Sequence, residues 1–438
     1  MSEKKTTTQA EEQQEEKKPF VPKTAQIEQI KNYLLENWHF RYNVITQTLE
    51  YREGNSIGFD QLTDQVKTDI VIALKQQMFK KPKEDLDDIF NSSLIPRFNP
   101  IKEYFDNLPY DGDGHISKLA SRIVLDDPDR LISGVRYKDL FRSYFERWLM
   151  ACYLCSTGKL VNDIMLILIG AQGRFKTSFL NFLTPSVLQD YRVCSHINPT
   201  LTDYNTSNFL AEKFFINVDD QMENIFGKDY NSMKAIISAP DITNRKLYRA
   251  SHQRRKRIAN FCGSVNESRF LRDSNNRRYL CFAISDILPD YNTIDIDAVW
   301  AEVKHKADKA NRMYIFGKED YKMIDQMNAS FEAPTEEAEA LQTLFAPSDE
   351  TGDGNTYYMQ FTEILQLLRE YTHNNSLKPY NLQTAMRKYG YATRSIKVQR
   401  FSMQPRNLYP VRTITTESWV WDRLYKYLKQ QLIEGGEL

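Results

Sequence analysis

Apolar residues follow two spacings along the central part of the chain. Short and nearly continuous apolar runs lie at 163–169, 214–218, 258–265 and 279–284. Such runs are typical of strands that are buried on both faces of a sheet. Around them apolar residues recur at helical spacing, most clearly at 137–155. Strands that alternate with helices predict an α/β fold with a parallel-type sheet, and we place this domain at 131–333.

The pattern changes on the N-terminal side of this domain. Residues 1–22 contain almost no apolar side chain, so we expect a disordered tail. Residues 23–130 begin with an amphipathic helix at 27–38, followed at 40–51 by an aromatic and β-branched stretch that predicts a strand or hairpin. Further helices up to residue 90 complete the prediction of a mainly helical accessory domain in a mixed α/β region.

The C-terminal side predicts a linker and a small separate domain. Residues 334–356 contain Pro, Glu, Ser, Asp and Gly and few apolar residues, which favours a linker, and the domain then spans 357–438. Its predicted elements are helices at 361–371 and 380–389 and strands at 392–401 and 409–414. This order is typical of a winged-helix module. The second helix and the hairpin carry Arg387, Lys388, Arg394, Lys397 and Arg400. These cations favour DNA contact, and the alternative is a small packing domain with a solvated basic face.

The first apolar strand leads into a glycine-bearing loop at 170–177, with the sequence Gly-Ala-Gln-Gly-Arg-Phe-Lys-Thr, and then into a helix. Backbone N–H groups of such a loop can hold phosphates, and the positive end of the following helix favours negative charge. Lys176 would then reach the β- and γ-phosphates of ATP, and Thr177 would bind Mg²⁺. The residues expected around the nucleotide are Gly170, Gln172, Gly173, Arg174, Phe175, Lys176, Thr177 and Ser178.

One residue of this loop departs from the P-loop pattern. The position just before the lysine, which is normally glycine, is Phe175. A phenylalanine adopts positive φ only at a cost. The alternative interpretation is therefore a strand, turn and helix that merely end in Lys-Thr.

The other groups that ATP hydrolysis needs follow the later strands. Asp219 and Asp220 end the second strand, where one carboxylate can anchor Mg²⁺ and its neighbour can orient the attacking water. Asn266 ends the third strand, where its amide can hold that water. Arg277 and Arg278 precede the fourth strand, from which an arginine can reach a neighbour's γ-phosphate in a ring ATPase. Each signal alone has an ordinary structural explanation, whereas the four in this order predict an ATPase.

At this point the chain resembles a known family, the virulence-associated E proteins, which are P-loop ATPases of phages and mobile elements related to superfamily 3 helicases. The resemblance covers roughly residues 25–320 and rests on motifs that recur in order. These are the loop 170–177 and the segments 98–112, 233–241 with Arg245 and Tyr248-Arg249, 263–266, 270–273 and 276–278.

The resemblance implies a fold and a role for each matching residue. The fold would be a P-loop core of the AAA+ or superfamily 3 helicase type. The implied roles are phosphate and Mg²⁺ binding for Lys176 and Thr177, metal and water acids for Asp219 and Asp220, the sensor for Asn266, and a trans-acting finger for Arg277 or Arg278. Arg257 also matches a basic position of the family.

Cations gather in the segment before the third strand. Between Asp241 and Arg257 there is one acid and an excess of cations with interleaved rings, and the residues of interest are Arg245, Lys246, Tyr248, Arg249, His252, Arg254, Arg255, Lys256 and Arg257. The resemblance places a pore-lining hairpin here, whose cations would hold DNA phosphates while Tyr248 or His252 stacks on bases. The alternatives are a solvated basic loop, or arginines that complete a neighbour's ATP site.

Composition narrows the class of protein. The 438 residues carry 58 basic and 58 acidic side chains, so any attraction to DNA must be local. No apolar run is long enough to span a bilayer, and the N-terminal residues lack the apolar region of a signal peptide, which predicts a cytoplasmic protein. The five cysteines fit reduced thiols, and Cys152 and Cys155 form a lone CxxC that we interpret as helix packing.

The sequence therefore predicts an ATP- and Mg²⁺-dependent, helicase-like motor for DNA replication in a phage or mobile genetic element. It would act as a homo-oligomeric ring, by analogy a hexamer, on single-stranded or forked DNA. The alternative is an ATP-gated DNA-binding initiator or regulator that does not translocate.

Overall fold

The computed structural model describes residues 23–194, 197–219, 229–245, 252–266, 268–271, 276–310, 316–348, 356–398, 401–402 and 404–428. Six of the predicted site residues are affected by this limit. Asp220, Lys246, Tyr248 and Arg249 lie outside the described residues, and for His252 only the backbone is described, as for Arg245.

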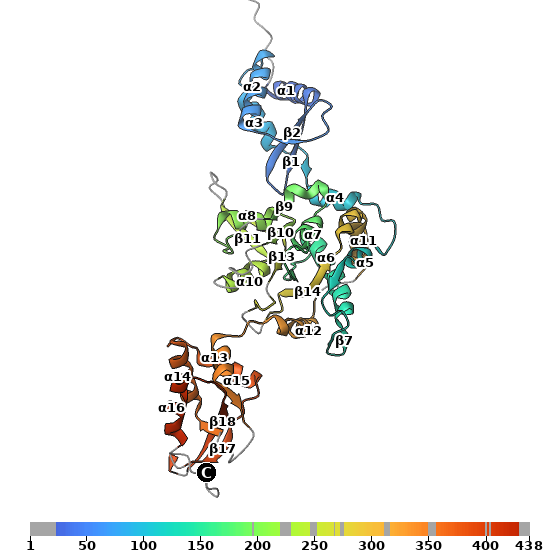
Figure 1. The fold of residues 1–438 in the computed structure, drawn as a ribbon. Helices are drawn as coiled ribbons and strands as arrows, with labels where there is room; N and C mark the ends of the chain where they lie inside the picture. Colours follow the sequence, from blue (N-terminus) through green and yellow to red (C-terminus); the bar gives the residue numbers. More distant parts are fainter. Residues whose placement is uncertain are drawn as a thin grey trace, which may run out of the picture.

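The N-terminal unit is a small sheet covered on one face by helices (Figure 1). Its strands follow the order β3-β2-β1-β4, and β1 and β2 form the antiparallel hairpin that the sequence predicts. Phe40 of this hairpin packs against Ile70 and Leu86 of the helices, so the alternating apolar positions face inward. The elements are α1 (Lys23–Asn37), β1 (Trp38–Asn43), β2 (Thr48–Glu53), β3 (Asp60–Gln61), α2 (Asp64–Gln76), α3 (Pro82–Asn91) and β4 (Arg97–Phe98).

The central unit contains a six-stranded sheet of order β5-β14-β8-β13-β10-β9. All neighbours in it are parallel except β5, which pairs antiparallel with β14. The strands are β5 (Ile123–Leu125), β8 (Met165–Ile169), β9 (Arg192–Cys194), β10 (Phe215–Val218), β13 (Asn260–Val265) and β14 (Tyr279–Ile287). After β8 the chain forms β9, β10 and β13 on one side of this strand, and it then passes to the other side to form β14. The carboxyl end of β8 therefore lies where the strand order reverses.

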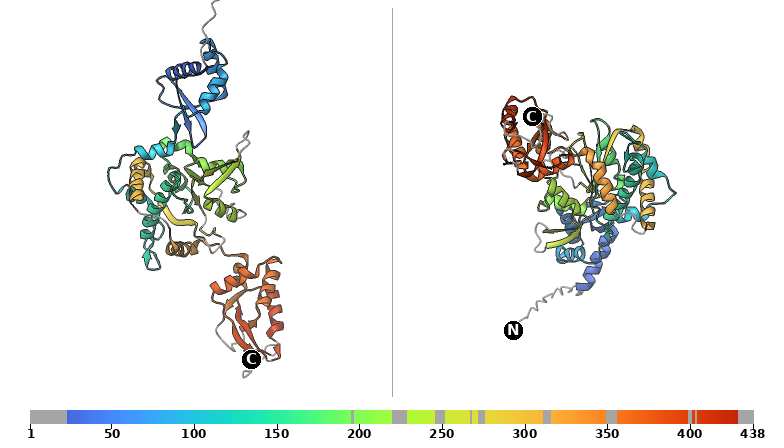
Figure 2. Two further views of the ribbon diagram at one scale, coloured as in Figure 1. Left: turned by 180° about the vertical axis from the view of Figure 1, so that it is seen from behind. Right: turned by 90° about the horizontal axis from the view of Figure 1, so that it is seen from below.

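Helices cover both faces of this sheet, as Figures 1 and 2 show. Alternate residues of β8 point to opposite faces: Leu166 and Leu168 enter the core with α6, α7 and α11, and Ile167 enters the core with α8 and α10. The helices are α6 (Tyr137–Ser156), α7 (Lys176–Phe182), α8 (Tyr204–Glu212), α10 (Tyr230–Ser238), α11 (Ile296–Lys309) and α12 (Lys318–Asn328). Short 3-10 helices η1 (Ser186–Tyr191), η2 (Pro289–Thr293) and η3 (Ala329–Phe331) and small hairpins β6 (Leu131–Ile132) with β7 (Val135–Arg136) and β11 (Asp241–Arg245) with β12 (His252–Lys256) complete it.

The chain joins the central core well before residue 130, where the sequence predicted the boundary. Helices α4 (Pro100–Asn107) and α5 (His115–Ala120) place Ile101, Phe105 and Ile116 in the same apolar cluster as α6. Short helices of this kind show no long periodic pattern, so their partners become visible only in the folded chain.

The C-terminal unit begins earlier than predicted, because the first part of the segment expected as a linker is structured. Residues 336–347 form α13 and β15, and Leu341 and Leu344 are fully buried among the helices of this unit. A four-stranded sheet joins β15, β18, β16 and β17. The elements are α13 (Glu336–Leu344), β15 (Phe345–Pro347), β16 (Thr356–Met359), α14 (Phe361–Thr372), α15 (Pro379–Lys388), β17 (Arg394–Lys397), β18 (Pro405–Thr413) and α16 (Ser418–Leu428). The whole is a mixed α/β protein, and none of the described helices is both long and apolar enough to cross a membrane.

Candidate nucleotide site and basic hairpin

The loop between β8 and α7 approaches the neighbouring strand closely. A Cβ atom on Gly170 would lie 2.5 Å from the carbonyl oxygen of Ile284, so only glycine fits this position. Gly173 has a φ of +80°, which glycine adopts without cost. The backbone therefore requires glycine at position 170 and favours it at position 173.

Phe175 keeps the backbone conformation that glycine would supply. Its φ is +55° and its ψ is +14°, which places it in the left-handed region at the first position before α7. This conformation costs a non-glycine residue roughly 1–2 kcal/mol. The ring centroid lies 6.5 Å from that of Tyr291, which itself packs on Phe179 and Phe182, and about half of the residue stays exposed. Ring packing thus offsets part of the backbone strain.

Lys176 is folded back onto the loop. The residue is 5% exposed, and Nζ donates hydrogen bonds to the carbonyl oxygens of Gly170 (2.6 Å) and Ala171 (2.8 Å). Nζ also donates to Oδ1 of Asn266 at 3.0 Å. The ammonium group is therefore held between the loop and the end of β13, where the sequence placed the sensor amide.

Asp219 receives two hydroxyl hydrogen bonds, one to each carboxylate oxygen. Thr177 Oγ1 donates to Oδ2 at 2.5 Å, and Ser264 Oγ donates to Oδ1 at 2.5 Å. Ser264 was missed in the sequence. The available signal was the period of two along β13, because Ser264 and Asn266 are two residues apart and so share one face of the strand.

Four of the predicted residues thus lie together at the carboxyl edge of the parallel sheet. Lys176 and Thr177 begin α7, Asp219 follows β10 and Asn266 follows β13. The first N–H groups of α7 have no partner within the helix, and no side chain of the N-cap residue binds them. An ammonium group, a hydroxyl–carboxylate pair and open N–H groups are what a metal-bound phosphate chain requires. Arg174 stands outside this cluster, with NH1 3.4 Å from Oδ2 of Asp286.

Arg277 and Arg278 lie at the opposite end of the sheet. The backbone N–H of Met165, the first residue of β8, donates to the carbonyl oxygen of Arg278 at 2.8 Å. The four steps of β8 to Ile169 span about 13 Å, so neither backbone position adjoins the loop of its own chain. Arg278 is half-buried and its Nε donates to Ser238 Oγ at 2.5 Å, whereas Arg277 is exposed, 5.2 Å above the ring of Tyr321.

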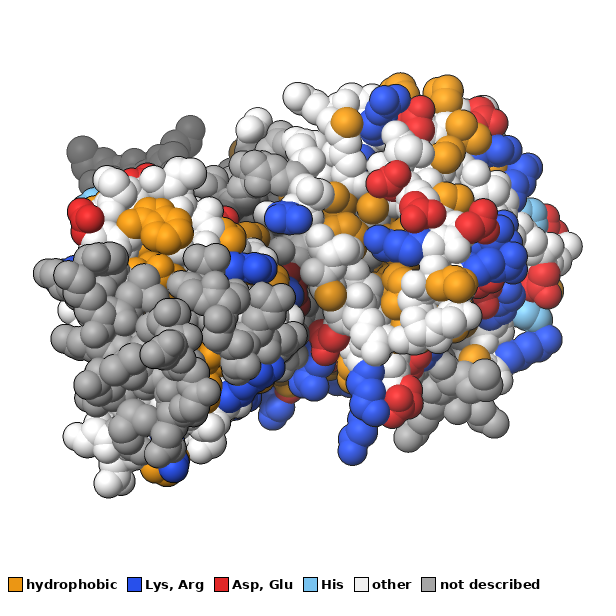
Figure 3. Space-filling view, turned by 60° about the horizontal axis from the view of Figure 1, so that its bottom comes forward, with side chains coloured by type: hydrophobic (Ala, Val, Ile, Leu, Met, Phe, Trp, Pro, Cys, Tyr) orange, Lys and Arg blue, Asp and Glu red, His pale blue; other side chains and the backbone are white. Residues whose placement is uncertain are grey.

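The basic segment before β13 forms an antiparallel hairpin of β11 and β12, with the turn outside the described residues. Arg254 of this hairpin is 76% exposed, and it lies 2.5 Å from Oδ2 of Asp241. Lys256 is also exposed, and its Nζ donates to the carbonyl oxygen of Gly158 at 3.3 Å. On the face drawn in Figure 3, described Lys and Arg side chains are interspersed with Asp and Glu, without one continuous basic area.

Two predicted DNA contacts are wrong, because their side chains are held inside the protein. Arg257 is 1% exposed, and its guanidinium donates to the carbonyl oxygens of Ile236, Ile237 and Asn162. Arg255 is 11% exposed, pairs with Glu212 at 2.9 Å and donates to the carbonyl oxygen of Ile45 in the N-terminal unit. Both arginines bind protein groups at the base of the hairpin and do not face solvent.

Comparisons with known proteins place the chain in a family. Solved structures that resemble it include "The apo structure of NrS-1 C terminal region (305-718)", with 11% identity, a TM-score of 0.46 and coverage of 89% of this chain and 99% of that one. "The A form apo structure of NrS-1 C terminal region-CTR" gives 12% identity, a TM-score of 0.44 and coverage of 88% and 98%. No curated protein matches the chain. The model of the virulence-associated protein E-like domain matches residues 106–333, which is just over half of the chain. The chain therefore belongs to the virulence-associated protein E-like family.

Proposed function

We propose that this protein is an ATP- and Mg²⁺-dependent motor on DNA, with a P-loop ATPase core at its centre. The observation that carries the proposal is the joining of Lys176, Thr177, Asp219 and Asn266 by hydrogen bonds at one sheet edge. These residues come from three segments far apart in sequence, and each has a side chain suited to one part of phosphoryl transfer. A purely structural loop has no need of all four at this edge.

The residues present fit both ligands. Gly170 leaves no room for a side chain beside Ile284, and the uncapped start of α7 offers N–H groups to phosphate oxygens. Thr177 and Asp219 would hold Mg²⁺, which supplies positive charge against the phosphates when bound. Lys176 would leave the loop carbonyls for the phosphate chain, and Asn266, once released from Lys176, would orient water. Asp220 remains the proposed second acid.

The proposed active form is a ring, by analogy a hexamer, in which each site is completed by a neighbour. Arg277 and Arg278 precede β14 at the edge of the sheet away from Lys176, so a finger from there would serve another subunit. Arg277 is the better candidate because it is exposed, while Arg278 is engaged by Ser238.

DNA would be held by two surfaces. The first is the hairpin of β11 and β12, where Arg254 and Lys256 remain available once Arg255 and Arg257 are removed from the set. The second is the C-terminal unit, which we propose to be winged-helix-like. Its helix α15 exposes Arg387, and the adjoining strand β17 exposes Lys397, beside β18. The resemblance further favours a cytoplasmic replication role in a phage or mobile element.

A second candidate function is favoured by Phe175. A strained residue at the glycine position would slow the closing of the loop around nucleotide, because the bound conformation carries the cost of positive φ. The protein would then be an ATP-gated DNA-binding initiator that turns over too slowly to translocate.

Strand separation of a forked duplex with ATP and Mg²⁺ tests the two proposals together. The motor predicts separation that is lost in Lys176→Ala and kept in Lys322→Ala, an exposed lysine on α12. DNA binding that changes with nucleotide, without separation, would replace the motor by the initiator. The absence of any nucleotide effect on DNA binding or separation would contradict both.

A further inference from the structure

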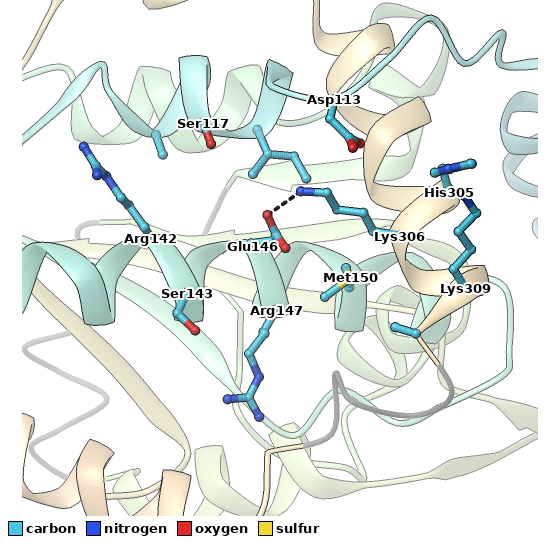
Figure 4. Close-up of a pocket in the computed structure, with 13 residues that line it drawn as sticks. Asp113, Ser117, Arg142, Ser143, Glu146, Arg147, Met150, His305, Lys306 and Lys309 are labelled. Carbon is cyan, nitrogen blue, oxygen red and sulfur yellow. Dashed lines mark hydrogen bonds and ion pairs between the residues drawn. The ribbon is translucent and has the colours of Figure 1, made fainter. Parts of the chain in front are cut away.

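A cavity of about 590 Å³ lies on the outer side of α6, where α5 and α11 pack beside it. Figure 4 shows its walls, which come from these three helices and from the turn before α5. None of its lining residues belongs to the candidate nucleotide site or to the basic hairpin. The volume is in the range of small-molecule sites, which is roughly 300–1,000 Å³.

The charges that line the cavity fall into two groups, apart from Asp113 in the turn before α5, whose Oδ1 accepts a hydrogen bond from the Tyr110 hydroxyl. Arg147 donates two hydrogen bonds to Asp320, at 2.7 and 2.8 Å, and Lys306 is shared by Glu146 (2.8 Å) and Glu302 (2.9 Å). These two cations and three carboxylates bind one another at the wall of the cavity. Two further cations, Arg142 and Lys309, have no hydrogen-bond or ion-pair partner anywhere in the described residues. They are the cations available to a ligand.

The two ends of the cavity differ in chemistry. Arg142 lies on α6 and Ser117 on α5, and Figure 4 draws both at the same end of the cavity, whereas the neighbouring Ser143 points to the other side of α6. Met150 lies eight residues further along α6, which is about 12 Å. The thioether there joins the side chain of Ile116 in an apolar floor.

An aromatic edge borders this apolar end. The imidazole of His305 stacks on the ring of Tyr110, with centroids 3.8 Å apart and planes at 11°. This stack fixes the orientation of His305 at the rim, and Lys309 lies one helical turn further along α11. One end thus offers donors for an anion, and the other offers apolar and ring surface.

We propose that this cavity binds a small phosphorylated organic molecule, with its phosphate at Arg142 and Ser117 and its body over Met150 and Ile116. Guanidinium and hydroxyl groups are preferred donors to phosphate oxygens. A length of about 12 Å accommodates one phosphate with a sugar or a nucleoside attached. The same chemistry fits a nucleoside monophosphate and a sugar phosphate, so the test must separate them.

Isothermal titration calorimetry on the full chain carrying Lys176→Ala tests the proposal, because this background removes the other phosphate site that we propose. The probes are AMP, glucose 6-phosphate, adenosine and inorganic phosphate. We expect AMP or glucose 6-phosphate to bind more tightly than adenosine and inorganic phosphate do. Binding of AMP alone would identify a nucleotide site, and binding of glucose 6-phosphate alone would identify a sugar phosphate site.

Two variants locate the binding. Arg142→Glu should weaken the bound probe by at least about tenfold, because it replaces a charge-assisted donor by a like charge. Lys102→Glu, at an exposed position of α4 outside the cavity, should leave affinity unchanged. Both residues are exposed, so circular dichroism should show an intact fold. The proposal is overturned if neither organic phosphate binds at millimolar concentration, if inorganic phosphate binds as tightly, or if Arg142→Glu has no effect.

Discussion

Replacing Arg257 should destabilise the protein without acting on DNA directly. The guanidinium lies beneath the end of α10, where it donates to the carbonyl oxygens of Ile236 and Ile237, and it also donates to Asn162. Arg257→Met keeps most of the volume and removes all three donations. Each buried carbonyl left without a donor costs about 1–3 kcal/mol. Removal of a buried cation returns part of this cost, so we expect a net loss of about 3–5 kcal/mol.

Arg254 provides the matched control for this substitution. It precedes Arg257 by three residues but is 76% exposed and has one described ion pair, to Asp241. Exposed pairs contribute at most about 1 kcal/mol, so Arg254→Met should leave stability almost unchanged and should weaken DNA binding.

Thermal unfolding and DNA binding, measured on the same preparations, separate these roles. For a unit of this size, Arg257→Met should lower Tm by about 6–20 °C. Its remaining folded fraction should bind DNA with the affinity of the unmodified protein. The reasoning is refuted if Arg257→Met unfolds at the original temperature and has lost DNA binding, which would mean that this side chain reaches solvent and contacts DNA.

Four further predictions follow from the site and its surroundings. Ser264→Ala frees one oxygen of Asp219 and should raise the Mg²⁺ concentration for half-maximal ATP hydrolysis about tenfold, while Ser264→Thr should not; equal Mg²⁺ dependence in both variants would exclude this role. Phe175→Gly removes the cost of positive φ and should increase ATP turnover by up to about tenfold; unchanged turnover would separate Phe175 from the rate. Mixing Lys176→Ala with Arg277→Ala subunits should restore ATP hydrolysis that neither variant has alone. In a mixed ring about one interface in four joins an intact Lys176 to an intact Arg277 of the neighbour, and no recovery would contradict a finger in trans. Ellman's reagent should label one thiol of the folded protein, Cys194, because the other four are buried and burial raises the pKa of three of those thiols; rapid labelling of a second thiol would contradict this packing.

The sequence could predict the central sheet because its strands are buried on both faces. In β8, Ile167 lies between Leu166 and Leu168 and all three are buried, so this apolar run is continuous. The parallel arrangement then requires that strand ends share one edge. For this reason Lys176, Asp219 and Asn266 could be expected together. In the structure Lys176 donates a hydrogen bond to Asn266, and Thr177, the next residue, donates one to Asp219.

What the sequence could not show depends on contacts between distant segments. In the sequence Arg257 belongs to a basic run. It is a buried donor because, in the folded chain, α10 and Asn162 both place carbonyl oxygens beside its guanidinium. Leu341 and Leu344 lie in a stretch with many acids, so their helix was missed until its partners in the C-terminal unit were known. Ser264 lies in the segment 263–266 but carries no charge, and its hydrogen bond to Asp219 became visible only in the structure.

The central claim is that Lys176 is part of an ATPase that works on DNA. The most direct test is steady-state ATP hydrolysis by the full chain with Mg²⁺, with and without single-stranded DNA, for the unmodified protein, Lys176→Ala and Lys322→Ala. We expect hydrolysis that DNA stimulates in the unmodified protein and in Lys322→Ala, and that is abolished in Lys176→Ala. Equal hydrolysis by Lys176→Ala, or no hydrolysis by any of the three with or without DNA, would contradict the claim.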